Sequence, residues 1–228
     1  MLLALILVIL VILLFGPQVW ANYVLKRYST DIDDMPGTGG ELAEHLVNRF
    51  ELDDINVEIT ENEGDHYNPE EKTIRLVEPI HKGKSLTAIV VAAHEVGHAL
   101  QQKYGYRPFL LRWRMARYVA VAEKVASAIL IVFPFAAMLT RMPVIGAFML
   151  MIGVGIMLLP VIFHLVTLPV EWDASFGRAL PILTKGNYIP DSAVPIAKKI
   201  LTAAALTYVA ASLASVLNFY RWIAILRR

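Results

Sequence analysis

The feature that most constrains this chain is the pentapeptide HEVGH at residues 94–98, inside an apolar run that begins at Leu86. His94 and His98 are four residues apart, so on a helix both imidazoles lie on one face and can reach one cation. Glu95 stands beside the first histidine, where a carboxylate can hold and deprotonate a water molecule bound to that cation. The spacing therefore predicts a metal centre built on a helix.

The residues around the pentapeptide favour such a helix over residues 86–103. Ser85 is a suitable N-cap, no helix breaker follows it, and Gly105 and Pro108 end the run. Gly97 lowers the helix propensity, but its missing side chain could let another backbone pack close to the metal. The alternative is an amphipathic helix that carries two histidines without a metal. The apolar surroundings disfavour it, because unpaired histidines are costly to bury.

The chain of 228 residues contains no cysteine and has a net charge of +1. Disulfides and thiolate ligands are thus excluded, and a metal must be held by histidine and carboxylate groups. The near-neutral charge gives no indication of a nucleic-acid partner. Because the pattern is the HExxH motif of zinc hydrolases, Zn²⁺ is the expected cofactor.

The composition predicts a membrane protein. Hydrophobic residues make up 57% of the chain and the mean hydropathy is +0.54, more apolar than an ordinary soluble domain. The expected fold is mainly α and polytopic, with four transmembrane helices in a lipid bilayer and a small zincin-like α+β catalytic segment. The expected transmembrane helices cover residues 1–25, 118–140, 142–170 and 200–222. Two soluble segments cover residues 26–117, with the HExxH helix, and residues 171–199.

Within residues 26–117 the hydrophobic spacing predicts a helix over residues 41–50 and strands near residues 55–59 and 73–77. The second strand directly precedes the HExxH helix. It could offer its edge to an extended peptide by strand addition, or it could belong to a plain structural hairpin.

A catalytic zinc ion takes three protein ligands and keeps a fourth position for water or substrate. Four spans place residues 26–117 and 171–199 on the same side of the membrane, so the third ligand should come from there. Glu171 is the first candidate, with Asp173 two residues on. His164 lies one heptad earlier on the same helix face, and is the rival ligand or a hydrogen-bonded core residue.

Basic residues near the spans predict that the zinc site faces the cytoplasm, by the positive-inside rule. The side with the HExxH segment carries Lys26, Arg27, Arg112, Arg114, Arg117, Arg178, Lys198 and Lys199. The other side carries Arg141, Arg221, Arg227 and Arg228.

Four stretches, in order, give the chain a family resemblance: DHY with a following Pro69 at residues 65–69, AAHEVGHA at 92–99, LPVEWDAS at 168–175 and AAALTYVA at 203–210. With them the chain resembles the YugP-like membrane zinc metallopeptidases of bacteria. The resemblance runs from about residue 37 to the C-terminus. It implies zinc on His94 and His98, Glu95 as the base, and the glutamate of the LPVE stretch, Glu171, as the third ligand.

The expected function is that of a membrane-bound zinc metalloendopeptidase acting on a protein or peptide. Glu95 would take a proton from the zinc-activated water, and His66 or Tyr67 could donate to the developing oxyanion, unless that pair is structural. One alternative is a structural zinc site closed by a fourth ligand, with His66 or His164 available. Another is a non-proteolytic membrane scaffold or adaptor. Glu95 argues against both alternatives, because neither needs a carboxylate beside a metal-bound water. The oligomeric state is left open.

Overall fold

A computed structural model describes residues 2–206, except Asn62 and most of residues 141–158. In that last stretch it describes Val144, Phe148, Met151, Ile152, Gly155 and Ile156. The helices are α1 (Leu2–Arg27), α2 (Gly39–Arg49), α3 (Glu78–His81), α4 (Leu86–Lys103), α5 (Arg107–Thr140), α7 (Leu159–Trp172) and α8 (Leu180–Lys185). A π-helix covers Asp173–Ala179, a 3-10 helix covers Asp191–Ala193, and residues 194–206 are helical.

The described residues form a sheet of three strands, β1 (Asn56–Thr60), β2 (His66–Asn68) and β3 (Thr73–Val77), in the order β1-β3-β2. β1 runs parallel to β3, and β2 runs antiparallel to it. β3, which precedes the HExxH helix, is therefore paired on both sides. The hypothesis that its edge accepts an extended peptide is wrong, because both edges are already hydrogen-bonded.

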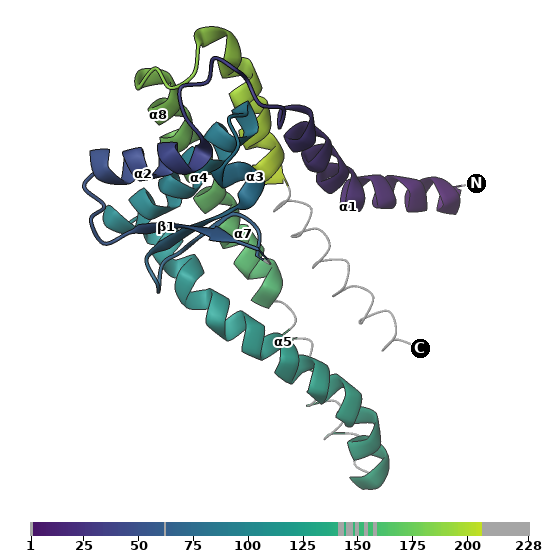
Figure 1. Ribbon diagram of the computed structural model, residues 1–228. Helices are drawn as coiled ribbons and strands as arrows, with labels where there is room; N and C mark the ends of the chain where they lie inside the picture. The colour runs from purple at the N-terminus through teal and green to yellow at the C-terminus, as the bar shows by residue number, and fades with distance from the viewer. Residues whose placement is uncertain are drawn as a thin grey trace.

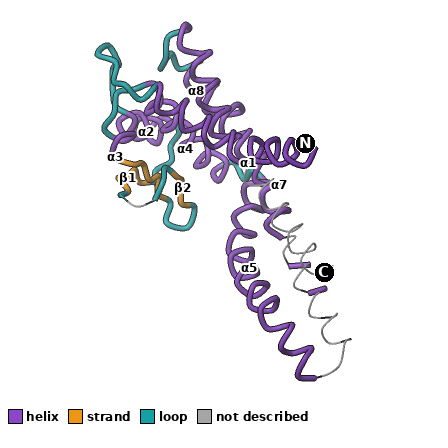
Figure 2. The backbone as a smooth tube through the Cα atoms, turned by 90° about the vertical axis from the view of Figure 1, so that its right-hand side faces the viewer, coloured by secondary structure: helices purple, strands orange, loops and turns teal. Residues whose placement is uncertain are grey.

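Helix α4 lies at the centre of the packed part of the molecule, and its bounds coincide with those expected for the HExxH helix. It begins after Ser85, whose side chain accepts a hydrogen bond from the backbone nitrogen of Ala88. Its small and branched apolar residues are buried against α2, the sheet and the π-helix. Figure 1 shows α2 and α4 over the same face of the sheet, while Figure 2 shows α5 extending away from this part of the molecule.

The expected architecture of four transmembrane helices is wrong for the described part of the chain. None of the helices formed by the described residues is both long and apolar enough to cross a membrane. The expected spans 142–170 and 200–222 lie partly outside the described residues. The multi-pass topology, and the cytoplasmic placement drawn from it, are therefore not supported.

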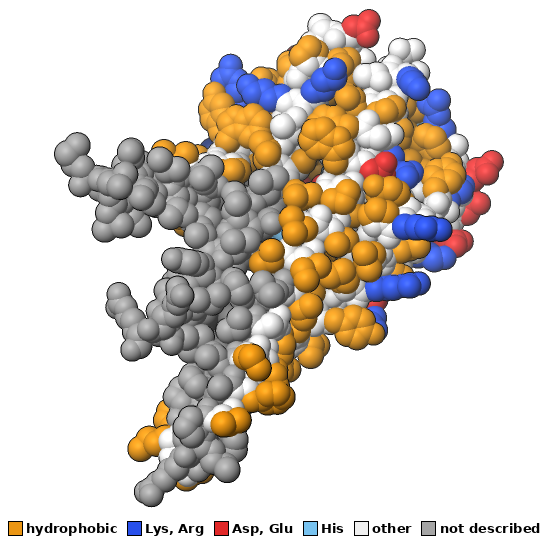
Figure 3. Space-filling view, turned by 180° about the vertical axis from the view of Figure 1, so that it is seen from behind, with side chains coloured by type: hydrophobic (Ala, Val, Ile, Leu, Met, Phe, Trp, Pro, Cys, Tyr) orange, Lys and Arg blue, Asp and Glu red, His pale blue; other side chains and the backbone are white. Residues whose placement is uncertain are grey.

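The physical reason for this error is that composition does not reveal where apolar residues go. Many of them form the core around α4, whose apolar run is buried except for the partly buried Val91. Others are exposed on the surface of α5 and α7, including Leu111, Val121, Leu165 and Trp172. Figure 3 shows hydrophobic side chains spread over a broad part of one face, with Lys and Arg toward its border.

Candidate metal centre

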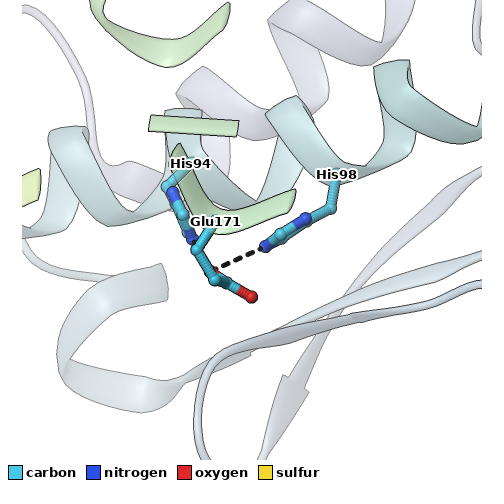
Figure 4. A group of neighbouring side chains, drawn as sticks. All are labelled: His94, His98 and Glu171. Atoms are coloured by element: carbon cyan, nitrogen blue, oxygen red, sulfur yellow. Dashed lines mark ion pairs between the residues drawn. The ribbon is translucent and has the colours of Figure 1, made fainter. Parts of the chain in front are cut away.

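Three buried side chains from two helices converge on one point. His94 and His98 project from α4, and Glu171 projects from the last turn of α7 (Figure 4). Oε2 of Glu171 lies 3.2 Å from Nε2 of His94 and 3.4 Å from Nε2 of His98. Each residue offers a ligand atom, and all three atoms lie within 4.8 Å of one another. The structure thus brings together the three residues expected to hold the metal, including the one from a distant segment.

The burial and the neighbours of the Glu171 carboxylate indicate whether a cation fits between the three side chains. Its side chain is 1% exposed, and neither oxygen accepts a hydrogen bond of regular geometry from the described residues. Close cationic or ionisable groups nevertheless surround it, with Nη1 of Arg112 lying 3.2 Å from Oε1. Two imidazole nitrogens facing one carboxylate oxygen need a positive charge between them, either a proton or a metal ion. The His-His-Glu donor set is one that zinc accepts.

Outer hydrogen bonds orient both imidazoles. Nδ1 of His94 lies 3.1 Å from Oγ of Ser175, and Nδ1 of His98 lies 3.0 Å from Oε1 of Gln101. Each ring therefore has its Nδ1 occupied and turns its Nε2 toward Glu171. Partners of this kind set the orientation and basicity of metal-binding histidines.

Gln101, Ser175 and Arg112 are site residues that the sequence analysis missed. A signal for Gln101 was available, because it lies three residues after His98 and so shares its helix face. Ser175 follows Glu171 by four residues, which a regular helix also places on one face. Arg112 carried no such signal, since it comes from α5 and reaches the site only through the tertiary fold.

The π-helix and Gly97 explain how the two ligand-bearing segments come close. The π-helix begins at Asp173, two residues after Glu171, and widens the helix where it crosses α4. A Cβ atom on Gly97 would lie 2.8 Å from the carbonyl oxygen of Ala174, closer than side chains tolerate. The missing side chain thus allows the backbone contact that places Glu171 over the histidines.

Burial and neighbouring charges shift the pKa values of Glu95 and Glu171 in opposite directions. Burial raises the pKa of Glu95 to about 7; the charge of His94 opposes this rise, and the nearby carboxylates of Glu171 and Asp65 add to it. Burial also acts to raise the pKa of Glu171, but the charge of His98 and close contact with His94 outweigh it. They hold that pKa well below its usual range. Glu171 is thereby kept ionised, the state in which a carboxylate can bind a metal ion.

The remaining candidates from the sequence lie outside the triad. His66 contacts the carbonyl oxygen of Gly64 at 2.7 Å, and Tyr67 donates to Oε1 of Gln102 at 2.6 Å. His164 lies on α7 with its ring against Phe163, and is not part of the metal-ligand group found among the described residues. Asp173 accepts hydrogen bonds from Gln101 and Arg178. These contacts give His66 and Tyr67 structural partners rather than a place beside the metal ligands.

A helix that carries two histidines and a glutamate, with a carboxylate supplied by a second helix, defines a zincin-type metal centre. Over residues 3–227 the chain matches the family described as "Putative neutral zinc metallopeptidase", and it belongs to that family. It is 36% identical over 223 residues to the "Putative membrane protease YugP" of Bacillus subtilis (strain 168), which covers 96% of this chain and 95% of that protein. No solved structure matches the chain. The family and the buried His-His-Glu group together identify zinc as the cofactor.

Proposed function

We propose that this protein is a zinc-dependent metalloendopeptidase, with His94, His98 and Glu171 as zinc ligands and Glu95 as the general base. The observation that carries the proposal is the buried triad together with the buried Glu95, which follows His94 in the sequence and whose pKa is influenced by the charges of His94 and Glu171. A zinc ion held there would lower the pKa of a bound water toward ~7 and polarise the scissile carbonyl.

The chain's own residues account for the proton transfers. Glu95 is 6% exposed and lies one residue from His94 on the same helix. Its ionised carboxylate takes the proton of the attacking water and then returns it to the nitrogen of the leaving amine. A base with a pKa raised toward neutrality is suited to both steps, because it can accept and release a proton near neutral pH.

The number of ligands favours a catalytic site over a structural one. The group found among residues 2–206, as far as these are described, offers three ligands, the number typical of catalytic zinc. His66 and His164, the candidates for a fourth ligand, lie outside the group. A structural site would also have no metal-bound water for Glu95 to deprotonate. The proposed substrate is a protein or peptide, which the enzyme would cleave at peptide bonds within its chain.

Glu95→Gln tests the proposal, because an amide cannot accept the proton of the water. We expect the variant to retain zinc and the fold of the wild type, and to lose hydrolysis of a library of fluorescent peptides blocked at both ends. Blocked ends restrict the assay to endopeptidase activity. Wild-type protein stripped of zinc by a chelator and then reloaded is the control, and its activity should disappear and return. Cleavage by Glu95→Gln at the wild-type rate would exclude Glu95 as the base.

A further inference from the structure

The side chain of Gln101 connects one metal ligand to the segment that carries another. It is fully buried on α4 and makes contacts in two directions. Its Oε1 lies 3.0 Å from Nδ1 of His98. Its Nε2 donates to the carbonyl oxygen of Val170 at 2.8 Å and to Oδ2 of Asp173 at 2.9 Å.

These partners fix which end of the amide faces the histidine. The carbonyl of Val170 can only accept a hydrogen bond, and the Asp173 carboxylate is an acceptor as well. The amide NH₂ of Gln101 must therefore point toward them, and its oxygen toward His98. An amide oxygen only accepts, so Nδ1 of His98 has to carry the proton. Nε2, which faces Glu171, is then the nitrogen left for the metal to bind.

Asp173 is itself held in place from outside. Nε of Arg178 donates to the same oxygen, Oδ2, at 2.7 Å. The guanidinium of Arg178 also lies over the rings of Tyr104 and Tyr106, at 5.7 Å and 5.9 Å from their centroids. This anchoring keeps the carboxylate an acceptor toward Gln101, and it ties the π-helix to the end of α4.

His94 differs from His98 because the partner of its Nδ1 does not fix the tautomer of the ring. Its Nδ1 faces the hydroxyl of Ser175 at 3.1 Å, and a hydroxyl can donate or accept. Ser175 can orient the ring of His94 without selecting its tautomer. Of the two histidines, only His98 has an Nδ1 partner that requires a proton on Nδ1.

We propose that Gln101, held by Val170 and Asp173, is a positioning residue that fixes His98 in its Nδ1-protonated form and so prepares Nε2 for the metal. The inference rests on the metal-ligand part of the proposed function. Outer partners of this kind typically contribute about 10- to 100-fold to metal affinity. Gln101 touches neither the metal position nor a substrate, and acts through His98.

Gln101→Met tests this role, since methionine has a similar length but its sulfur accepts a hydrogen bond from Nδ1–H only weakly. Metal-free full-length protein labelled with ¹⁵N-histidine is examined by two-bond ¹H–¹⁵N NMR, which reports which nitrogen of each imidazole ring carries a proton. His98, assigned with a His98→Asn variant, should carry a proton on Nδ1 in the wild type, whether or not Nε2 also holds a proton shared with Glu171. In Gln101→Met we expect a mixture of both tautomers. Zinc affinity, measured by chelator competition, should fall about tenfold or more.

The neighbouring Gln102 supplies a matched control on the same helix. Its Oε1 accepts from the hydroxyl of Tyr67, away from the metal ligands. Gln102→Met should leave the His98 tautomer and the zinc affinity unchanged. Should Gln101→Met fail to fold, Asp173→Leu removes one of the two anchors of the amide. Asp173→Leu should still produce signal from the Nε2-protonated tautomer of His98. Its zinc affinity should fall about threefold or more, a smaller loss than that expected for Gln101→Met.

Two results would overturn the inference: a mixed tautomer at His98 in the wild type, or unchanged tautomer and zinc affinity in the folded Gln101 or Asp173 variant. The NMR readout uses metal-free protein and requires no activity. If Glu95→Gln still hydrolysed peptides, the proposed catalytic role would fail while the His98 result stood. If the wild type kept Nδ1 of His98 protonated but hydrolysed no peptide, the inference about Gln101 would stand and the proposed peptidase function would fail.

Discussion

The carbonyl oxygen of Ala174 lies against Gly97 so closely that a Cβ atom there would approach it to 2.8 Å. Gly97 is buried in the middle of α4, between the two histidines, and Ala174 belongs to the π-helix. The contact is between two backbones, neither of which can move aside as a side chain can. The distance between α4 and the segment that carries Glu171 therefore depends on this glycine.

Gly97→Ala should lower both stability and zinc affinity. In an exposed helix the same change would stabilise by roughly 0.5–1 kcal/mol, because alanine is the better helix former. Here the added methyl group should push the π-helix away, with a loss of about 1–3 kcal/mol in the free energy of unfolding. Chemical denaturation and chelator competition measure the two effects. Gly16→Ala is the control, since a Cβ there would meet Ile12 at an ordinary 3.7 Å. Equal behaviour of the two variants would contradict the close-contact explanation.

Glu171→Gln should bind far less zinc than His164→Ala. The first change removes the charge of a ligand that is in contact with both histidines, whereas His164 lies outside the group. We expect Glu171→Gln to lose at least about tenfold in zinc affinity and His164→Ala to remain near the wild type. Metal analysis of the two purified variants decides between these residues, and an equal loss in both would mean that Glu171 is not the third ligand.

Hydrolysis should decline as the pH falls through the pKa of Glu95, because only the ionised carboxylate accepts a proton. Burial raises that pKa from 4.5 to about 7, and a bound cation acts in the opposite direction. The acid limb of kcat/KM should thus have its midpoint between these two values. Bound zinc must be measured at each pH, because acid also protonates the histidine ligands and releases metal. A zinc-loaded enzyme with a flat profile from pH 7 to about 4.5 would be inconsistent with Glu95 as the base.

Arg112→Met should destabilise the metal-free protein more than the zinc-loaded protein. Nη1 of Arg112 lies 3.2 Å from Oε1 of the buried Glu171 carboxylate, so its loss removes a compensating positive charge. A bound zinc ion would supply positive charge at the other oxygen. We expect a larger rise in Tm on zinc addition in Arg112→Met than in the wild type, measured by thermal unfolding. Arg112→Lys keeps the charge and should lie between them, and an unchanged zinc response in Arg112→Met would argue against this role.

The features of the centre that depend on one segment of the chain were predictable from the sequence. Those that depend on the packing of distant segments were predictable only in part. The helix of residues 86–103 followed from its cap and its apolar run, and the close approach at Gly97 followed from its missing side chain. Glu171 was reached through a four-span topology that the described residues do not support. It was also reached through the family resemblance, and this second route agrees with the family match. Arg112 and the π-helix could not have been found, because neither has a local pattern that distinguishes it before the helices are packed.

The two helices that supply the triad are far apart along the chain, since α5 and the residues up to α7 separate His98 from Glu171. A zinc ion bound by both would act as a cross-link that closes this long loop. Closing a loop removes conformational freedom chiefly from the unfolded chain, and the effect grows slowly with loop length. Because the ion binds the assembled site in preference to the separated ligands, zinc supply would also control how long the folded protein survives. In a cell short of zinc, the amount of this protein could decline through unfolding and degradation as well as through loss of catalysis.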